Sequence, residues 1–180
     1  TLSQFKDRLL RGTGPDVTRW GQGLTGPMAA AVAKLCDVHE LIQIARKIRH
    51  PSRARTRIGD SGRLSSRCQP NHPVDDPSGV TLLIYAGLSL GSGDCLIGVN
   101  PAVDTVANVG SLLEHLHQVR SALEVPTQIC VLAHLKTQLA CLREGRPVEI
   151  LFQSLAGTDR TLIEEFDVTV DLLDRGYAEM

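Results

Sequence analysis

The stretch CLIGVNPAVDTVANVGSLLEHLHQVRSALEVPTQICVLAH, residues 95–134, decides the fold class. It opens with an apolar run, Cys95–Val99, that stops at Asn100-Pro101 because a proline cannot continue a central ladder of hydrogen bonds. An amphipathic helical pattern follows, and then a second apolar run, Ile129–Ala133. Both runs are apolar throughout, as in strands buried on both faces. Strands that alternate with helices predict a parallel sheet built from right-handed βαβ units.

The same alternation continues on both sides of this stretch. Each helical pattern has a capping residue near its start or a glycine or proline at its end. Asp75 beside Asp76 is also compatible with a pair of catalytic carboxylates, but helix capping is the favoured interpretation. We expect a weak strand at Thr56–Ile58, a helix capped by Asp76 and ended by Gly91 and Gly93, a helix capped by Asp104 and broken by Pro126, a helix from Leu135 to Gly145, a strand at Val148–Phe152, and a last helix opened by Leu162, Phe166, Val170 and Leu173.

Polar residues end the expected strands at one edge of the sheet, namely Asn100, His134 and Gln153. In a β/α barrel the carboxyl ends of the strands form the active rim, and four strand–helix units are about half of the eight that such a barrel needs. The pattern therefore predicts an α/β fold, the first half of a (β/α)8 TIM-type barrel. A doubly wound open sheet is the alternative.

Helices precede the expected barrel. We predict them at Leu2–Leu10, ended by Gly12, Gly14 and Pro15, at Met28–Cys36, capped by Thr25, and at Val38–Ile48. The predicted domains are an N-terminal helical segment, 1–53, and a half barrel, 54–180. The chain starts at Thr1 and reaches Met180 inside a helical pattern, so we expect a fragment of a longer protein.

The composition is that of an ordinary globular domain. The chain has 180 residues, of which 22% are charged and 42% hydrophobic, and a net charge of −1. Neither nucleic acid nor a membrane is favoured as a partner, since there is no strong field, no signal peptide and no apolar run long enough to span a bilayer. The basic run Arg46–Arg57 has no aromatic residues among its charges, so we interpret it as a solvated linker, with phosphate contact in a larger assembly as the alternative.

Cysteines and histidines give no sign of a metal site. The five cysteines are an odd number and no two have CxxC spacing, which favours reduced thiols over a disulfide framework. His115 and His117 are two residues apart on an expected helix and so point to different sides. We predict no metal ligands in the protein.

A long polar loop, Ile58–Pro77, interrupts the alternating pattern. Long polar loops on a regular scaffold usually carry function. This loop holds Arg67, Gln69 and Asn71 close together, with prolines that stiffen the backbone. One fixed cation and two amides suit a small polar ligand.

Several runs closely resemble the large subunit of ethanolamine ammonia-lyase, and the similarity covers essentially the whole chain. They are GLTGPMAAAVAKLC (23–36), GRLSSRCQPN (62–71), GLSLGSGDCLIGVNPAVDTVANV (87–109), PTQICVLAHLKTQ (126–138) and ILFQSLAGT (150–158).

The resemblance implies an adenosylcobalamin-dependent lyase that converts ethanolamine to acetaldehyde and ammonia by a radical route. Family members have a β/α barrel preceded by helices and pair with a small subunit in a higher hetero-oligomer. The family also uses two carboxylates from later strands, so we expect this chain alone to be inactive. A cytoplasmic location is implied, and housing in a bacterial microcompartment is left open.

The resemblance also implies roles for five residues. Arg67, Gln69 and Asn100 would contact the substrate, with Arg67 as the catalytic group, and Pro101 and Gln153 would lie against the cobalamin. These residue types suit ethanolamine, because a guanidinium is always charged and can donate to the hydroxyl oxygen, while amide oxygens can accept from the ammonium or hydroxyl.

The sequence also contains one departure from the family pattern and features that suggest other interpretations. Cys68 stands where the family usually has leucine, and we expect slightly looser packing there. Asp37-Val38-His39 begins like the cobalamin motif DxHxxG, but Ile42 replaces the glycine, so His39 is rejected as a cobalt ligand and the cofactor is expected to keep its own base. Lys136 beside a strand end leaves a Schiff-base aldolase as an alternative. A non-catalytic assembly module is a further alternative.

Overall fold

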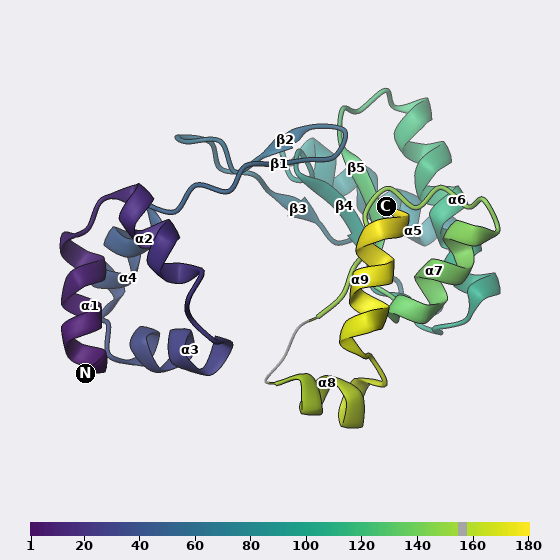
Figure 1. Cartoon of the computed structure of the whole chain (residues 1–180). Helices are drawn as coiled ribbons and strands as arrows, with labels where there is room; N and C mark the ends of the chain where they lie inside the picture. The colour runs from purple at the N-terminus through teal and green to yellow at the C-terminus, as the bar shows by residue number, and fades with distance from the viewer. Residues whose placement is uncertain (155–157) are drawn as a thin grey trace. The chain divides into compact units, whose positions relative to one another are not determined.

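A computed structural model describes residues 1–154 and 158–180, which form two compact units (Figure 1). The first unit comprises Thr1–His50 and the segment that holds helix α8 (Asp159–Phe166). The second unit begins at Pro51 and also includes the C-terminal segment Val168–Met180. Among the described residues, the parallel sheet lies entirely in the second unit.

The N-terminal part of the first unit is a cluster of four helices, α1 (Leu2–Arg11), α2 (Gly14–Gly21), α3 (Gly26–Lys34) and α4 (Val38–Ala45). Leu9, Val17 and Val32 form its core, with the rings of Phe5 and Trp20 packed edge to face at 6.4 Å between centroids. The predicted helices and the Thr25 cap are confirmed. Helix α2 differs from the prediction, in which Pro15 helps to end the preceding helix. Pro15 instead lies in the first turn of α2, after the N-cap Thr13.

The second unit contains a parallel three-stranded sheet in the order β3-β4-β5. Its strands are β3 (Arg67–Cys68), β4 (Leu96–Val99) and β5 (Gln128–Val131), and the helices that follow them are α5 (Pro77–Ser89), α6 (Val106–Ala122) and α7 (Leu135–Arg143). Strands and helices alternate as the sequence predicted, which confirms an α/β fold with parallel strands.

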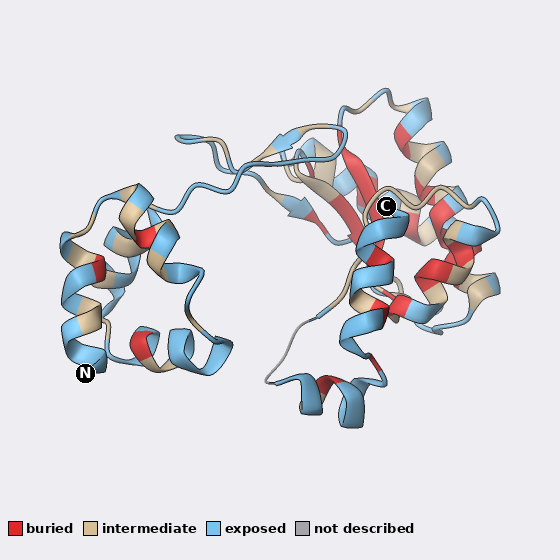
Figure 2. Ribbon diagram, viewed as in Figure 1, coloured by how far each residue is buried: buried red, intermediate tan, exposed pale blue. Residues whose placement is uncertain are grey.

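The two faces of this sheet differ in composition. One face packs against α5 and α6 and is apolar and buried. Figure 2 shows that most residues of β4 and β5 are buried. We call it the helix-facing side, and its strand residues are Cys68, Ile97, Val99, Ile129 and Val131. Because side chains alternate along a strand, the intervening residues lie on the other face, which we call the open face: Arg67, Leu96, Gly98, Gln128 and Cys130. The runs predicted to be apolar on both faces, Cys95–Val99 and Ile129–Ala133, place Leu96, Gly98 and Cys130 on the open face, and the polar side chains of that face, Arg67 and Gln128, lie outside those runs.

The predicted weak strand at Thr56–Ile58 has a different role from the one expected. Strand β2 (Arg57–Ile58) pairs antiparallel with β1 (Ser52–Arg53) in a hairpin, and β3 is the first strand of the parallel sheet. The Gln128 side chain holds this hairpin, since its amide oxygen accepts from the backbone N–H groups of Arg55 and Thr56, both at 3.1 Å. Arg67 therefore lies within a strand and not in a loop after one.

The strand predicted at Val148–Phe152 is wrong, because this stretch has no regular secondary structure. Side chains take the place of a strand partner here. The Ile129 N–H donates to the Glu149 carboxylate at 2.9 Å. The Gln138 amide accepts from the Phe152 N–H at 2.8 Å and donates to the Phe152 carbonyl at 2.7 Å. Backbone groups satisfied in this way do not need a ladder.

Two predicted helix boundaries are also corrected. The single last helix is two helices, α8 and α9 (Val170–Glu179), because Asp167 adopts a left-handed conformation at the end of α8 and Thr169 caps α9. The N-cap of α6 is Thr105 and not Asp104. No helix among the described residues is long and apolar enough to cross a membrane.

Candidate functional site

The candidate site lies at the carboxyl ends of β3 and β4, where neighbouring parallel strands end at the same edge of the sheet. Arg67 is exposed in β3, and its side chain lies across β4 at Gly98, where an added methyl group would be 3.0 Å from the guanidinium Nε. Asn100 is exposed and follows the last residue of β4. Arg67 and Asn100 thus come from adjacent strands of one sheet.

Asn71 joins the loop after β3 to the end of β4. Its side-chain oxygen accepts a hydrogen bond from the Asn100 backbone N–H at 2.8 Å. Gln69, exposed between Arg67 and Asn71, is carried on the same loop. Asn71 was predicted to be one of the ligand groups, whereas its amide oxygen binds the backbone of Asn100.

Asp75 and Asp76 have separate structural roles. Asp76 caps α5, accepting from the Gly79 N–H at 2.7 Å, which confirms the predicted cap. Asp75 is buried, with a positive φ of 53°, and its carboxylate accepts from the Ala102 N–H at 2.8 Å and the Asn108 amide at 2.7 Å. Both aspartates are therefore engaged with the scaffold, which argues against a catalytic carboxylate pair. Asp75 instead braces the loop after β4.

A second brace joins the loop after β4 to the end of β5. The Asp104 carboxylate, predicted to cap α6, accepts from the His134 backbone N–H at 2.6 Å. The ring Nδ1 of His134 accepts from the Lys136 N–H at 3.1 Å, so His134 caps α7. The rim loops of the three strands are thus linked in series, from β3 to β4 and from β4 to β5.

The electrostatics of the site leave one positive charge without compensation. Within residues 1–154 and 158–180, no carboxylate forms an ion pair with the Arg67 guanidinium. Burial raises the pKa of the nearby Cys130 thiol to about 11, against the opposing effect of the Arg67 charge. The thiol is therefore neutral at physiological pH, and Arg67 keeps its full charge for a ligand. No group of three or more metal-ligating side chains occurs in the described part of the chain.

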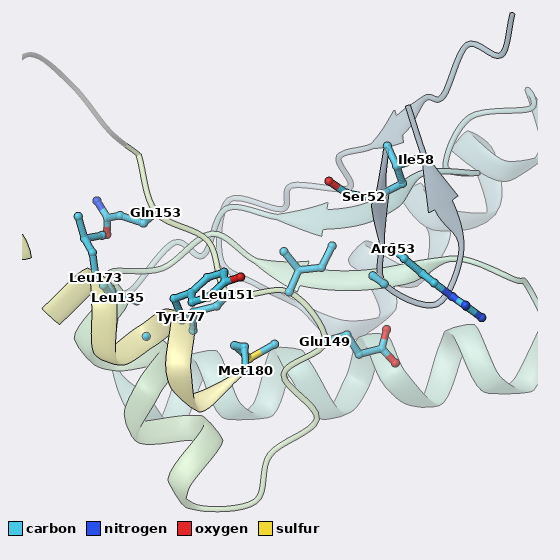
Figure 3. A pocket seen from close by; sticks show the side chains of 13 residues that line it. Ser52, Arg53, Ile58, Leu135, Glu149, Leu151, Gln153, Leu173, Tyr177 and Met180 are labelled. Atoms are coloured by element: carbon cyan, nitrogen blue, oxygen red, sulfur yellow. The ribbon is translucent and has the colours of Figure 1, made fainter. Parts of the chain in front are cut away.

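The two residues expected against a cofactor lie in different surroundings. Pro101 is half-buried directly after Asn100. Gln153 is half-buried on the wall of a cavity of about 420 Å³, and its side-chain amide donates to the Ser154 carbonyl at 2.6 Å. Figure 3 shows this cavity, with Ser52 and Ile58 of the hairpin on one side and Tyr177 and Met180 of the C-terminal segment on the other. Its lining includes none of the other four predicted site residues.

Cys68 packs closely on the helix-facing side of β3. An added methyl group at Gly87 of α5 would lie 2.4 Å from the Cys68 sulfur, so the small thiol and the glycine let the helix approach the strand. Burial raises the pKa of this thiol above its ordinary value. The looser packing expected here is not seen at this contact, and a leucine at position 68 would need more room than α5 leaves.

The residues behind the alternative interpretations lie on helices. Lys136 is exposed in the first turn of α7, beyond β5. His39 lies in α4, as predicted, and Asp37 caps that helix.

Comparison with known proteins gives one consistent result. The family model "Ethanolamine ammonia lyase large subunit (EutB)" matches residues 1–180. The ethanolamine ammonia-lyase large subunit of Escherichia coli (strain K12) is 42% identical over 163 residues, which are 91% of this chain and 36% of that protein. The large subunit of Salmonella typhimurium (strain LT2) is 41% identical over the same shares. The chain thus spans about a third of the length of these relatives, and it belongs to the ethanolamine ammonia-lyase large subunit family.

Proposed function

We propose that this chain is part of the catalytic subunit of an adenosylcobalamin-dependent ethanolamine ammonia-lyase, which converts ethanolamine to acetaldehyde and ammonia. The observation that best supports the proposal is the polar rim: Arg67 and Asn100 come from adjacent strands, and the loop that carries Gln69 is bonded through Asn71 to Asn100. The proposed reaction is taken from the family to which the chain belongs.

The residue types of the rim match the two polar ends of ethanolamine. In the proposed complex the Arg67 guanidinium donates to the substrate hydroxyl oxygen, and its uncompensated charge strengthens that bond. The amide oxygens of Gln69 and Asn100 accept from the ammonium or the hydroxyl. Such contacts would orient the substrate without any proton transfer to these three side chains.

Pro101 and Gln153 are the proposed cofactor contacts. Both are uncharged and half-buried, which fits a corrin ring whose rim carries amide groups. When bound, adenosylcobalamin would supply the radical chemistry, while the protein supplies orientation and electrostatics. In this proposal the cofactor keeps its own base on cobalt.

The proposal extends to the fold and the assembly. The units of β3, β4 and β5 with their following helices would be successive units of a (β/α)8 barrel, 54–180, preceded by a helical segment, 1–53. A small subunit of the same enzyme would be the partner in a larger hetero-oligomer. A cytoplasmic location, with or without a microcompartment, is part of the same proposal.

The test is the turnover of Arg67→Ala in the complete large subunit that carries this sequence, assembled with the small subunit and cofactor. Loss of a positioned donor should lower acetaldehyde production by about a hundredfold or more. Arg63→Ala is the matched control, because Arg63 is an exposed arginine in the segment that precedes β3, and it lines a different cavity, toward the amino ends of the strands. Near-normal turnover of Arg67→Ala would overturn the assignment.

A second test addresses the aldolase alternative. A Schiff-base enzyme would be inactivated by borohydride in the presence of a carbonyl substrate, with the label on Lys136. We expect no labelling, because Lys136 is exposed on α7 and not on the open face.

A further inference from the structure

We propose that Gly98 is a positioning residue for Arg67. Because Gly98 has no side chain, β4 leaves a slot at this position, and the guanidinium of Arg67 lies in that slot and is directed toward the rim. The inference rests on the proposed role of Arg67 and adds a second residue to it. Gly98 acts through Arg67 and does not itself touch the substrate.

The backbone at Gly98 gives no conformational reason for a glycine. Gly98 is buried in the middle of β4 and is not among the described glycines with a positive φ. Glycine in a strand interior weakens the strand, and it often marks a place where another group must approach the backbone closely. The reason for glycine here is therefore space.

The space is occupied by Arg67. An added methyl group at Gly98 would lie 3.0 Å from the Arg67 Nε and 3.4 Å from its Cζ. On the β5 side the same methyl would lie 3.3 Å from the Leu132 Cδ1. Because neighbours crowd the position from both sides, a side chain there would push the exposed guanidinium off the strand. Gly98 thus sets where the charge of Arg67 is held.

The thiol beside the slot leaves that charge available. Cys130 stands opposite Gly98 in the register of β4 and β5 and lies on the same open face. Burial raises the pKa of Cys130 to about 11, so the slot contains a neutral thiol and not a thiolate that would neutralise Arg67. The space at Gly98 and the neutral thiol of Cys130 therefore both favour the same position and charge of the Arg67 guanidinium.

Gly110 provides a matched control in the same unit. It is buried in α6, and an added methyl group there would lie 3.2 Å from the Nε and 3.4 Å from the Cζ of Arg146. Arg146, however, is engaged in ion pairs with Glu114 and Glu144, away from the rim. The two glycines therefore make the same kind of contact with an arginine, but only one of those arginines is proposed to meet substrate.

The experiment is a double-mutant cycle in the assembled holoenzyme. We expect Gly98→Ala to lower kcat/KM by about tenfold to a hundredfold, as expected when a catalytic group is misplaced by about 1 Å. In an Arg67→Ala background the same substitution should have almost no further effect, because the group that it displaces is gone. Gly110→Ala should leave kcat/KM near the wild-type value.

The outcomes separate this inference from the proposed function. An equal loss from Gly98→Ala in both backgrounds, or no loss in either, would overturn the positioning role while leaving Arg67 assigned. The positioning role would also be overturned if neither Gly98→Ala nor the double variant assembled. The exposed Arg67 side chain should move aside more easily than the sheet distorts, so the positioning role predicts that both variants fold. A near-normal Arg67→Ala would instead overturn the proposed function.

Discussion

The two faces of the β3-β4-β5 sheet are built from alternate residues of the same strands, yet they serve different ends. The helix-facing side is uniformly apolar, buried, and packed against α5 and α6. The open face carries a charged group at Arg67, a bare backbone at Gly98 and a buried amide at Gln128. Stability is therefore concentrated on one face, and the groups suited to bind a ligand on the other.

The open face is itself divided from one strand to the next. In β5, Gln128 is fully buried and bonded to the β1–β2 hairpin. In β3, Arg67 is level with Gln128 in the register, through Leu96 of β4, but it is exposed, as is Asn100 after the end of β4. The hairpin therefore covers the polar group of β5 and leaves Arg67 and Asn100 accessible.

The largest expected difference between the faces is in the free energy of unfolding lost when adjacent residues of β5 are truncated. Ile129→Ala removes a fully buried side chain from the helix-facing core and should lower the free energy of unfolding by about 2–5 kcal/mol. Native-state hydrogen exchange of the β5 amides would measure the loss as faster opening.

Cys130→Ala is the control for that prediction. It removes a single buried sulfur from the open face, and it should cost only about 1 kcal/mol. If both substitutions accelerated exchange equally, the stability of the sheet would not be concentrated on the helix-facing side.

Sequence patterns predicted the helix-facing side well and the open face poorly. Apolar runs and caps act locally, so the alternation of strands and helices, the Asp76 cap and the stop at Asn100-Pro101 were all readable from the sequence. What the open face contacts depends on residues distant in sequence. The hydrogen bonds of Gln128 to the hairpin connect it to Arg55 and Thr56, which are 73 and 72 positions away in the sequence. No local sequence pattern predicts contacts over such a separation.

The candidate site was predicted in the same uneven way. Family motifs indicated Arg67, Gln69 and Asn100, but not the braces at Asn71, Asp75 and Asp104, each of which bonds to a residue 27 to 33 positions away. The failed strand at Val148–Phe152 has the same cause. Its apolar pattern is that of a strand, but the Gln138 and Glu149 side chains satisfy the backbone groups that a strand would have paired.

An intermediate effect is expected from pH, and it isolates the open face. The pKa of Cys130 is raised from 9.0 to about 11 in the folded protein, so folding favours the protonated thiol. The stabilisation is fully present below pH 9 and is lost as the pH rises toward 11, because the unfolded chain releases the proton first. The shift corresponds to about 2–3 kcal/mol.

Urea unfolding at pH 8 and at pH 11 would measure this contribution. Cys130→Ala should unfold with a smaller loss of stability over that interval than the wild-type protein, while Cys36→Ala, on the N-terminal helices, should match the wild type more closely because Cys36 is only half-buried. Parallel curves for wild type and Cys130→Ala would show that the thiol is not held protonated.

The smallest effect is expected at the boundary between the two sides, where Asp75 and Asp76 are adjacent in sequence but serve opposite faces. Asp76→Ala removes only the N-cap of α5, whose Gly79 N–H remains able to bond water, and should cost about 1 kcal/mol with fraying of the first turn. Substrate binding should be unchanged, since α5 covers the helix-facing side.

Asp75→Ala instead removes the hydrogen bonds to the Ala102 N–H and the Asn108 amide, and it should raise KM for ethanolamine by loosening the loop that follows Asn100. Steady-state kinetics of the two variants in the holoenzyme, with exchange at α5 as the second readout, would distinguish them. A raised KM in Asp76→Ala and not in Asp75→Ala would mean that the rim depends on the helix layer, and the separation of the two faces would fail.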